Sequence, residues 1–135
     1  MTRNKPLIVC FIVLPFSYSP SFSQSKPWPV PKDVLALKNP YVQDDGSTKS
    51  GKLLYVKYCV TCHGDKGKGN GIAAASLNPK PADHTSVALQ SELDGSLFYK
   101  VTNGRSPMPQ FKTTLTDAQR WSLISYIRTL AVKPK

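Results

Sequence analysis

The stretch KLLYVKYCVTCHG, residues 52–64, decides the fold of this chain. It places Cys59 and Cys62 three residues apart and puts His63 directly after the second cysteine. The apolar residues ahead of the cysteines recur at spacings suited to one helix face, namely Leu53, Leu54, Tyr55 and Tyr58. We therefore expect a helix that starts near Thr48 and runs into the cysteines.

Two cysteines at this spacing allow a strained disulfide, metal binding or attachment of haem in an oxidising compartment. Zinc would need two further ligands of the right kind, but the only other histidine is His84, and the only other cysteine, Cys10, lies in the segment expected to be removed as a signal peptide. A thioredoxin-like redox pair would need a βαβ context, which the sequence lacks. In C-x-x-C-H, thiols one helical turn apart add to the haem vinyl groups and the next residue reaches the iron. The motif predicts one haem c, bound through Cys59 and Cys62 and ligated by His63.

A glycine-rich loop is expected after the motif. Residues 64–71, GDKGKGNG, contain four glycines, which break regular structure and permit positive backbone dihedrals. The loop has no Walker spacing, no hydroxyl after a Gly-Lys pair and no preceding strand, so it does not match a phosphate-binding loop. Residues 77–81, LNPKP, are expected to be extended because of their prolines.

Two further helices are predicted towards the C-terminus. The first lies within residues 91–104 and ends at Asn103-Gly104; its apolar face comprises Leu93, Leu97, Phe98 and Val101. The second starts at a capping box of Thr116 and Gln119 and ends before Pro134; its apolar positions are Trp121, Leu123, Ile124, Ile127 and Leu130. No segment alternates like a strand and no internal repeat is visible. The expected fold is all-α with long Gly- and Pro-rich loops.

Residues 1–23 have the features of a secretory signal peptide: a basic start, an apolar stretch over residues 7–16 and small residues before the expected cleavage site. The apolar stretch is shorter than the roughly 20 residues that span a bilayer. Lipidation at Cys10 is disfavoured by Val9, since a small residue is usual there. We expect an exported, periplasmic protein, with membrane association only if this segment stays uncleaved or lipidated.

Residues 24–46 form a Pro-rich arm ahead of a haem domain at residues 47–135. The arm contains four prolines and no sustained helical period, so it is expected to be extended. Either it is a solvated linker, or its apolar residues hold it against the domain; these are Trp28, Val30, Val34, Leu35 and Leu37. The number of apolar residues favours packing.

The chain is strongly basic, with a formal net charge of +10. Removing residues 1–23 takes away two basic residues and no acidic ones, which leaves +8. Such a charge favours acidic surfaces and governs association rate and salt sensitivity, although some of the lysines serve solubility alone. Redox partner proteins with acidic docking surfaces fit an exported protein, whereas nucleic acid does not.

Five stretches of the sequence together resemble the class I cytochromes c: CVTCHG, the glycine-rich loop, LNPKP, GRSPMPQF and WSLISYIRTL. The resemblance covers residues 47–130. It implies a small haem domain of three to four helices with His and Met as axial ligands. It also implies that the first and last helices cross beside the haem, with Gly51 and Tyr55 on one side and Leu123 and Tyr126 on the other.

Met108 is the candidate sixth ligand, because it is the only methionine besides the initiator. Pro107 and Pro109 flank it, as in the ligand loop of the family that the chain resembles. The alternative role for Met108 is to fill a gap in the core. The rival ligand is His84, which lies in a polar PADHTS stretch and is expected to be an exposed loop residue.

The resemblance implies that a proline carbonyl, of Pro79 or Pro81, accepts the Nδ1 hydrogen of the proximal histidine. Arg105 either pairs with a haem propionate or faces water. The aromatic residues near the ligands are expected to pack against haem or between helices and to have no redox role; these are Phe98, Tyr99 and Trp121.

A haem iron with His and Met ligands has no open position for a substrate, so we expect one-electron transfer and no enzymatic activity. The leading hypothesis is a periplasmic electron carrier in a respiratory chain. The alternative is a haem subunit docked on a dedicated dehydrogenase or reductase complex, with the arm as its attachment. A haem enzyme or gas sensor would require Met108 to be absent from the iron.

Overall fold

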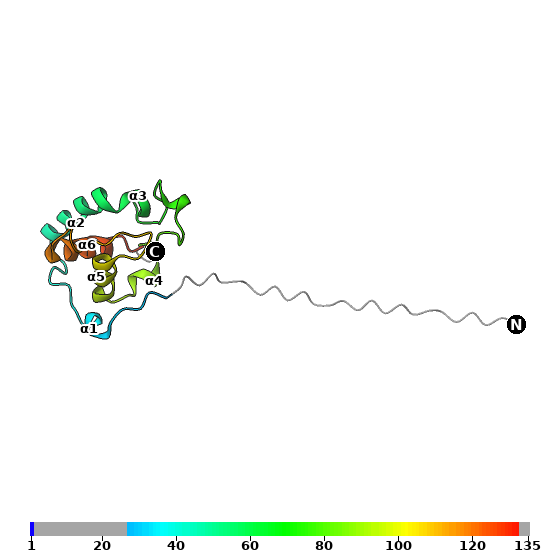
Figure 1. Cartoon of the computed structure of the whole chain (residues 1–135), viewed down its shortest axis with the longest axis horizontal. Helices are drawn as coiled ribbons and strands as arrows, with labels where there is room; N and C mark the ends of the chain where they lie inside the picture. The colour runs from blue at the N-terminus through cyan, green and yellow to red at the C-terminus, as the bar shows by residue number, and fades with distance from the viewer. Residues whose placement is uncertain (2–26, 133–135) are drawn as a thin grey trace.

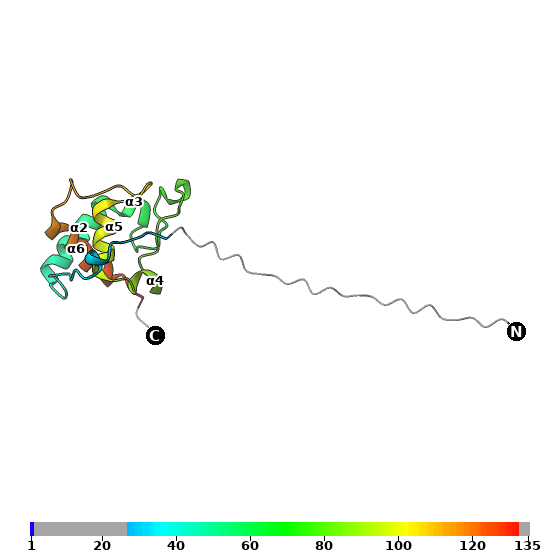
Figure 2. The ribbon, with the colours of Figure 1, turned by 60° about the horizontal axis from the view of Figure 1, so that its bottom comes forward.

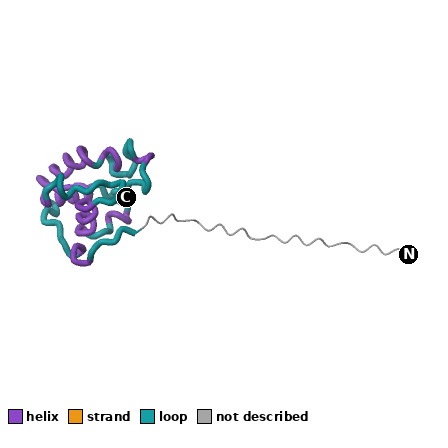
Figure 3. The backbone as a smooth tube through the Cα atoms, viewed as in Figure 1, coloured by secondary structure: helices purple, strands orange, loops and turns teal. Residues whose placement is uncertain are grey.

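The computed structural model describes Met1 and residues 27–132. Figure 1 shows short helices and long loops gathered into one body, and Figure 3 shows no strand among the described residues. The helices are α1 (Lys32–Leu35), α2 (Asp45–Tyr58), α3 (Val60–His63), α4 (Val87–Gln90), α5 (Asp94–Asn103) and α6 (Asp117–Thr129). A 3-10 turn covers Ala74–Ser76. The predicted all-α class is confirmed, and α2, α5 and α6 are the three predicted helices.

Helix α2 begins at Asp45, a few residues before the expected start, because Asp44 caps it by accepting a hydrogen bond from the Ser47 backbone N–H at 2.8 Å. Tyr55 is completely buried in the core. Leu53 is 74% exposed, so its placement on the buried face was wrong. The physical reason is that residues two apart on a helix point in different directions, and Tyr55 takes the inward one.

Helices α2 and α6 cross and form the main contact of the domain. At the crossing, a side-chain Cβ at Gly51 would lie 1.9 Å from the Ser122 carbonyl oxygen, so only glycine allows this approach. Tyr55 packs on Tyr126 with ring centroids 5.2 Å apart, and Leu123 is buried beneath them. The crossing expected from the resemblance is confirmed.

Helix α6 starts at the predicted capping box: the Thr116 hydroxyl accepts from the Gln119 backbone N–H, and the Gln119 side chain accepts from the Thr116 backbone N–H. Its buried residues include Trp121, whose ring stacks on Phe98 of α5 at 4.0 Å. Helix α5 ends at Gly104, as expected, but Leu93 is 51% exposed at its N-cap position and does not belong to the apolar face.

The described part of the arm, residues 27–46, packs against the domain, as its apolar content predicted (Figure 2). Trp28, Val30, Val34 and Leu35 are half-buried, whereas Leu37 is 44% exposed. The arm is extended in places but also contains the single turn of α1, a turn at residues 40–43 and the start of α2.

Other expectations concern the loop, the chain ends and the membrane. Gly64, Gly67 and Gly69 have positive φ angles, so the glycine-rich loop is built as expected.

Pro134 and residues 2–23 of the expected signal segment lie outside the described residues. In the part of the chain that the structure describes, no helix has the length and apolar character needed to cross a membrane.

Candidate functional site

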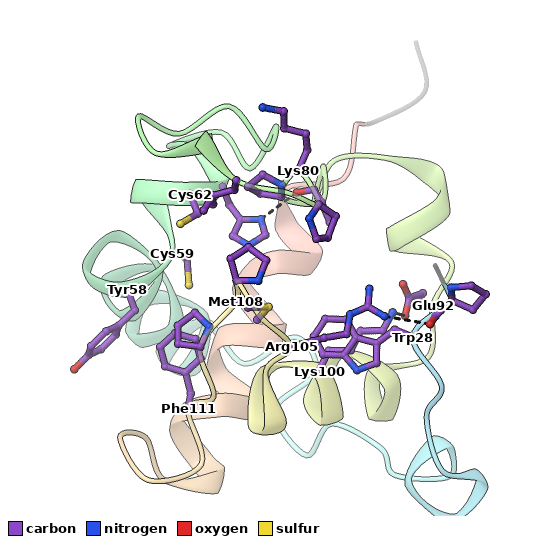
Figure 4. Close-up of a pocket in the computed structure, with 18 residues that line it drawn as sticks. Trp28, Tyr58, Cys59, Cys62, Lys80, Glu92, Lys100, Arg105, Met108 and Phe111 are labelled. Carbon is purple, nitrogen blue, oxygen red and sulfur yellow. Dashed lines mark hydrogen bonds and ion pairs between the residues drawn. The ribbon is translucent and has the colours of Figure 1, made fainter. Parts of the chain in front are cut away.

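A cavity of about 330 Å³ lies between the segment that follows α2 and the loop that follows α5. Figure 4 shows the sulfurs of Cys59 and Cys62 on one side, the Met108 sulfur near the middle, and Trp28 with Arg105 at the far end. Apolar residues make up much of its wall, including Leu77, Pro79, Pro81, Pro107, Pro109 and Phe111.

The two cysteines reach this cavity because the chain stays helical through the motif. Cys59 ends α2, with its N–H donating to the Tyr55 carbonyl at 2.8 Å, and Cys62 and His63 follow within α3. Both cysteines are free thiols. Burial, with a smaller contribution from neighbouring Cys62, raises the pKa of the Cys59 thiol to about 12. A thiol that stays protonated at neutral pH is poorly suited to a redox-active pair.

The described residues also offer no zinc site, because no group of three or more His, Cys, Asp or Glu side chains among residues 27–132 is arranged to hold a metal ion. The disulfide, zinc and redox-pair alternatives therefore receive no support from the geometry. What remains is a pair of thiols on the wall of an apolar cavity, with a histidine beside them.

His63 lines the cavity, and its ring is oriented by a backbone carbonyl. Its Nδ1 lies 3.0 Å from the Ala82 carbonyl oxygen, so Nδ1–H donates and Nε2 keeps its lone pair. Burial lowers the pKa of His63, which favours the neutral imidazole that binds metals.

The acceptor is Ala82, so the expectation of a proline carbonyl was wrong. The Pro81 carbonyl is turned towards the glycine-rich loop, where it would lie 2.4 Å from a Cβ built on Gly69. The next carbonyl along the chain, that of Ala82, accepts from His63. Pro79 and Pro81 contribute to the cavity wall instead.

His84 is buried, with 8% of its surface exposed, so the expected exposed loop histidine was also wrong. The loop folds back on the glycine-rich segment, where the His84 N–H donates to the Gly67 carbonyl at 2.6 Å. The His84 ring then stacks on His63, with centroids 4.0 Å apart and planes 19° apart. Its Nδ1 lies 3.2 Å from the Tyr55 hydroxyl. Burial, and then the charge of His63, lower the pKa of His84 to about 3.

This position places His84 against the proximal ring and outside the cavity wall, which does not favour the rival-ligand interpretation. The sequence carried no signal for the stacking, because it depends on how two loops pack. Tyr55 was expected only as a helix-packing residue, yet its hydroxyl also lies 3.3 Å from the Gly64 carbonyl. Tyr55 thus links α2 to the His84 ring and to the backbone that follows His63.

Met108 reaches the cavity on a tight loop closed by an antiparallel bridge. The Arg105 N–H donates to the Met108 carbonyl at 3.0 Å, and the Met108 N–H donates to the Arg105 carbonyl at 2.8 Å. Pro107 and Pro109 restrict the backbone on either side. Buried Phe111 anchors the end of the loop, with its N–H donating to the Val101 carbonyl of α5. The structure thus brings all four predicted site residues onto one cavity.

The polar residues at the far end of the cavity are Glu92, Lys100 and Arg105. The Arg105 guanidinium lies over the Trp28 ring, 4.5 Å from its centroid, and Lys100 is paired with Glu92 at 2.5 Å. Trp28 was not expected in the site, and no motif marks it. Phe98 and Trp121 pack between helices, and neither they nor Tyr99 line the cavity.

The donor set suits haem c. Two thiols stand three residues apart, an imidazole keeps Nε2 available, and a thioether approaches on a separate loop. The apolar wall matches a porphyrin face, and basic groups at one end match its carboxylates.

The sequence matches the family described as cytochrome c oxidase, cbb3-type, subunit III, over residues 46–127. A cbb3-type cytochrome c oxidase subunit CcoP of Azospirillum sp. (strain B510) is 34% identical over 98 residues, covering 72% of this chain and 33% of that protein. The chain spans about a third of the length of the curated oxidase subunits it matches. Cytochrome c6 of Euglena gracilis is 29% identical, over 60% of this chain and 90% of that protein.

Among solved structures, a chain of the Kuenenia stuttgartiensis reducing HAO-like protein complex superposes with a TM-score of 0.61. It is 26% identical, and the match covers 82% of this chain and 54% of that one. The match takes in more than residues 47–135, which make up about two thirds of the sequence. It therefore extends into the arm.

Proposed function

We propose that this protein is an electron carrier with a single haem. The premise is that the chain belongs to the class I c-type cytochromes, in the family of cytochrome c oxidase, cbb3-type, subunit III, and transfers electrons with covalent haem c. Cys59 and Cys62 would hold the haem covalently, and His63 and Met108 would be its axial ligands. The observation that carries the proposal is the convergence of these four residues on one cavity.

Each of these residues has a distinct task. The cysteines would hold the haem at the junction of α2 and α3. The Ala82 carbonyl orients the His63 ring and strengthens it as a ligand through the 3.0 Å hydrogen bond at Nδ1. The bridge between Arg105 and Met108 holds the Met108 thioether at the cavity wall.

When bound, haem c supplies an Fe(III)/Fe(II) couple, and methionine ligation raises its potential. If His63 and Met108 both ligated the iron, no coordination position would be left for a substrate, which favours electron transfer over an enzymatic activity. The preferred role is a periplasmic carrier in a respiratory chain, exported by residues 1–23. The net positive charge would steer it to redox partners with acidic docking surfaces, through small contacts below about 1,200 Å².

A second role, as a haem subunit docked on a dedicated dehydrogenase or reductase complex, is favoured by one observation. The similarity to a chain of the HAO-like complex extends into the arm, beyond the haem domain. The cbb3-type relatives are also oxidase subunits. Co-purification at high salt separates the roles, because an encounter driven by charge dissociates there whereas a fixed subunit stays bound.

The primary test is spectroscopic, on protein matured in a host that attaches haem c. We expect one haem per chain in the pyridine haemochrome assay, retention of haem in a denaturing gel, and the methionine-sulfur-to-iron band in the oxidised protein. We also expect the reduced protein not to bind carbon monoxide. Carbon monoxide binding without the sulfur band would instead support a haem enzyme or gas sensor.

A further inference from the structure

The arm is fixed to the domain far from the cavity by a buried asparagine. Asn39 is 6% exposed, and its side-chain amide donates to the Ser125 hydroxyl at 2.9 Å and to the Trp121 carbonyl at 3.4 Å. The Ser125 hydroxyl donates in turn to the Tyr41 carbonyl at 3.1 Å. Because these groups are shielded from water, the end of the arm is tied to α6.

A second attachment lies halfway along the arm. The Val34 carbonyl oxygen, in α1, would lie only 2.0 Å from a Cβ at Gly95, so the first turn of α5 accepts the arm because it carries a glycine there. Val34 and Leu35 are half-buried at this contact between α1 and α5. The arm therefore packs along the surface of the domain and is held there by contacts at two points.

The path ends at the cavity. Pro27 and Trp28 line it together with Arg105, although these residues are far apart in the sequence. The Arg105 guanidinium lies 4.5 Å from the centroid of the Trp28 ring and donates to the Pro27 carbonyl at 3.1 Å. Figure 4 shows Trp28 and Arg105 side by side at the end opposite the cysteines.

We propose that the arm is a strap that forms one wall of the haem pocket, and that Trp28 is a positioning residue that holds Arg105 at the carboxylate end of the haem. The inference rests on the proposed function, since it requires haem in this cavity. Residues 27–39 precede the stretch that matches the family model, residues 46–127, so this wall lies outside the matched domain.

Two physical effects of the strap act in the same direction. The indole excludes water from the haem edge, and a less polar surrounding disfavours the more highly charged Fe(III) state. A cation held beside the haem carboxylates also favours Fe(II). Both raise the reduction potential, so loss of Trp28 lowers it.

The test compares variants of the full-length holoprotein. For Trp28→Ala we expect a potential lower by about 28 mV, which is about a threefold change in the one-electron equilibrium. Trp28→Phe keeps an aromatic face for the guanidinium and retains most of the potential. Val30→Ala is the matched control, because Val30 is a half-buried arm residue outside the cavity wall, and its potential stays at the parent value. Equal potentials for Trp28→Ala and the parent would overturn the proposal.

A second measurement uses the unmodified protein, so it does not depend on how a variant folds. In the reduced, diamagnetic state we expect nuclear Overhauser effects between Trp28 ring protons and the carboxylate-bearing side chains of the haem. A normal methionine-sulfur band without these effects refutes the strap and leaves the proposed function intact. Absence of haem or of that band refutes the proposed function itself.

Discussion

The two sides of the cavity are built in different ways. The cysteine side consists of the helical run from Tyr55 to His63, tied by backbone hydrogen bonds of 2.8 to 3.1 Å and supported from behind by His84. The methionine side is a short loop held by one bridge between Arg105 and Met108 and anchored by Phe111. A cofactor fastened to the first side would be permanent, whereas a ligand supplied by the second side could be lost without losing the cofactor.

The most severe change to the cysteine side is Cys59→Ser with Cys62→Ser. Without thiols no thioether can form, so we expect no haem on the chain in a denaturing gel and a protein that is largely unfolded at 25 °C. The reason for unfolding is that a chain of this size relies on the cofactor as part of its core. Haem staining and circular dichroism measure both effects. Covalent haem in the double variant would contradict the assignment.

On the methionine side, Met108→Ala is expected to keep the haem and change its chemistry. The sixth position opens, the methionine-sulfur band disappears, the reduction potential falls and the reduced protein binds carbon monoxide. Optical titration under controlled potential measures the band and the potential, and adding carbon monoxide to the reduced protein measures whether the sixth position is open. The matched control is Met108→His, which supplies a different ligand and keeps the iron closed to carbon monoxide. An unchanged spectrum in Met108→Ala would show that Met108 is only a core residue.

The contrast between the two sides also explains what could be predicted from the sequence. Local patterns predicted the helical cysteine motif and the capping box at Thr116, because each depends on neighbours in the chain, and the family resemblance pointed to the proline-flanked loop around Met108. The Ala82 carbonyl, the stacked His84 and the wall formed by Trp28 depend on loops that meet in three dimensions. The hydrogen bond from Arg105 to Pro27, for example, joins residues 78 apart in the sequence.

A smaller effect is expected from the support behind the cysteine side. His84→Leu removes the 3.2 Å partner of the Tyr55 hydroxyl, which keeps its 3.3 Å hydrogen bond to the Gly64 carbonyl, so the free energy of unfolding should fall by about 0.5–1.5 kcal/mol. Denaturant unfolding of the holoprotein measures this loss, and the methionine-sulfur band should persist because the other side is untouched.

Tyr55→Phe completes a double-mutant cycle with His84→Leu. If the two side chains act as a pair, their combined loss falls short of the sum of the single losses by about 0.5–3 kcal/mol. Additive losses would mean that the stacking of His84 on His63 stabilises the protein without help from Tyr55. The cycle therefore identifies which contact supports the proximal histidine.

The smallest effect concerns how charge is distributed between the two sides. Lys80 and Lys100 both line the cavity. Lys100 is paired with the carboxylate of Glu92. Lys80 donates to the carbonyls of Ala74 and Ala75, which are neutral partners and do not compensate its charge. An anionic oxidant such as ferricyanide should therefore lose more rate in Lys80→Gln than in Lys100→Gln. At 1 M salt, where the screening length is about 3 Å, the two rates should converge. Equal losses at low salt would mean that the oxidant approaches from the methionine side, where Arg105 supplies the attraction.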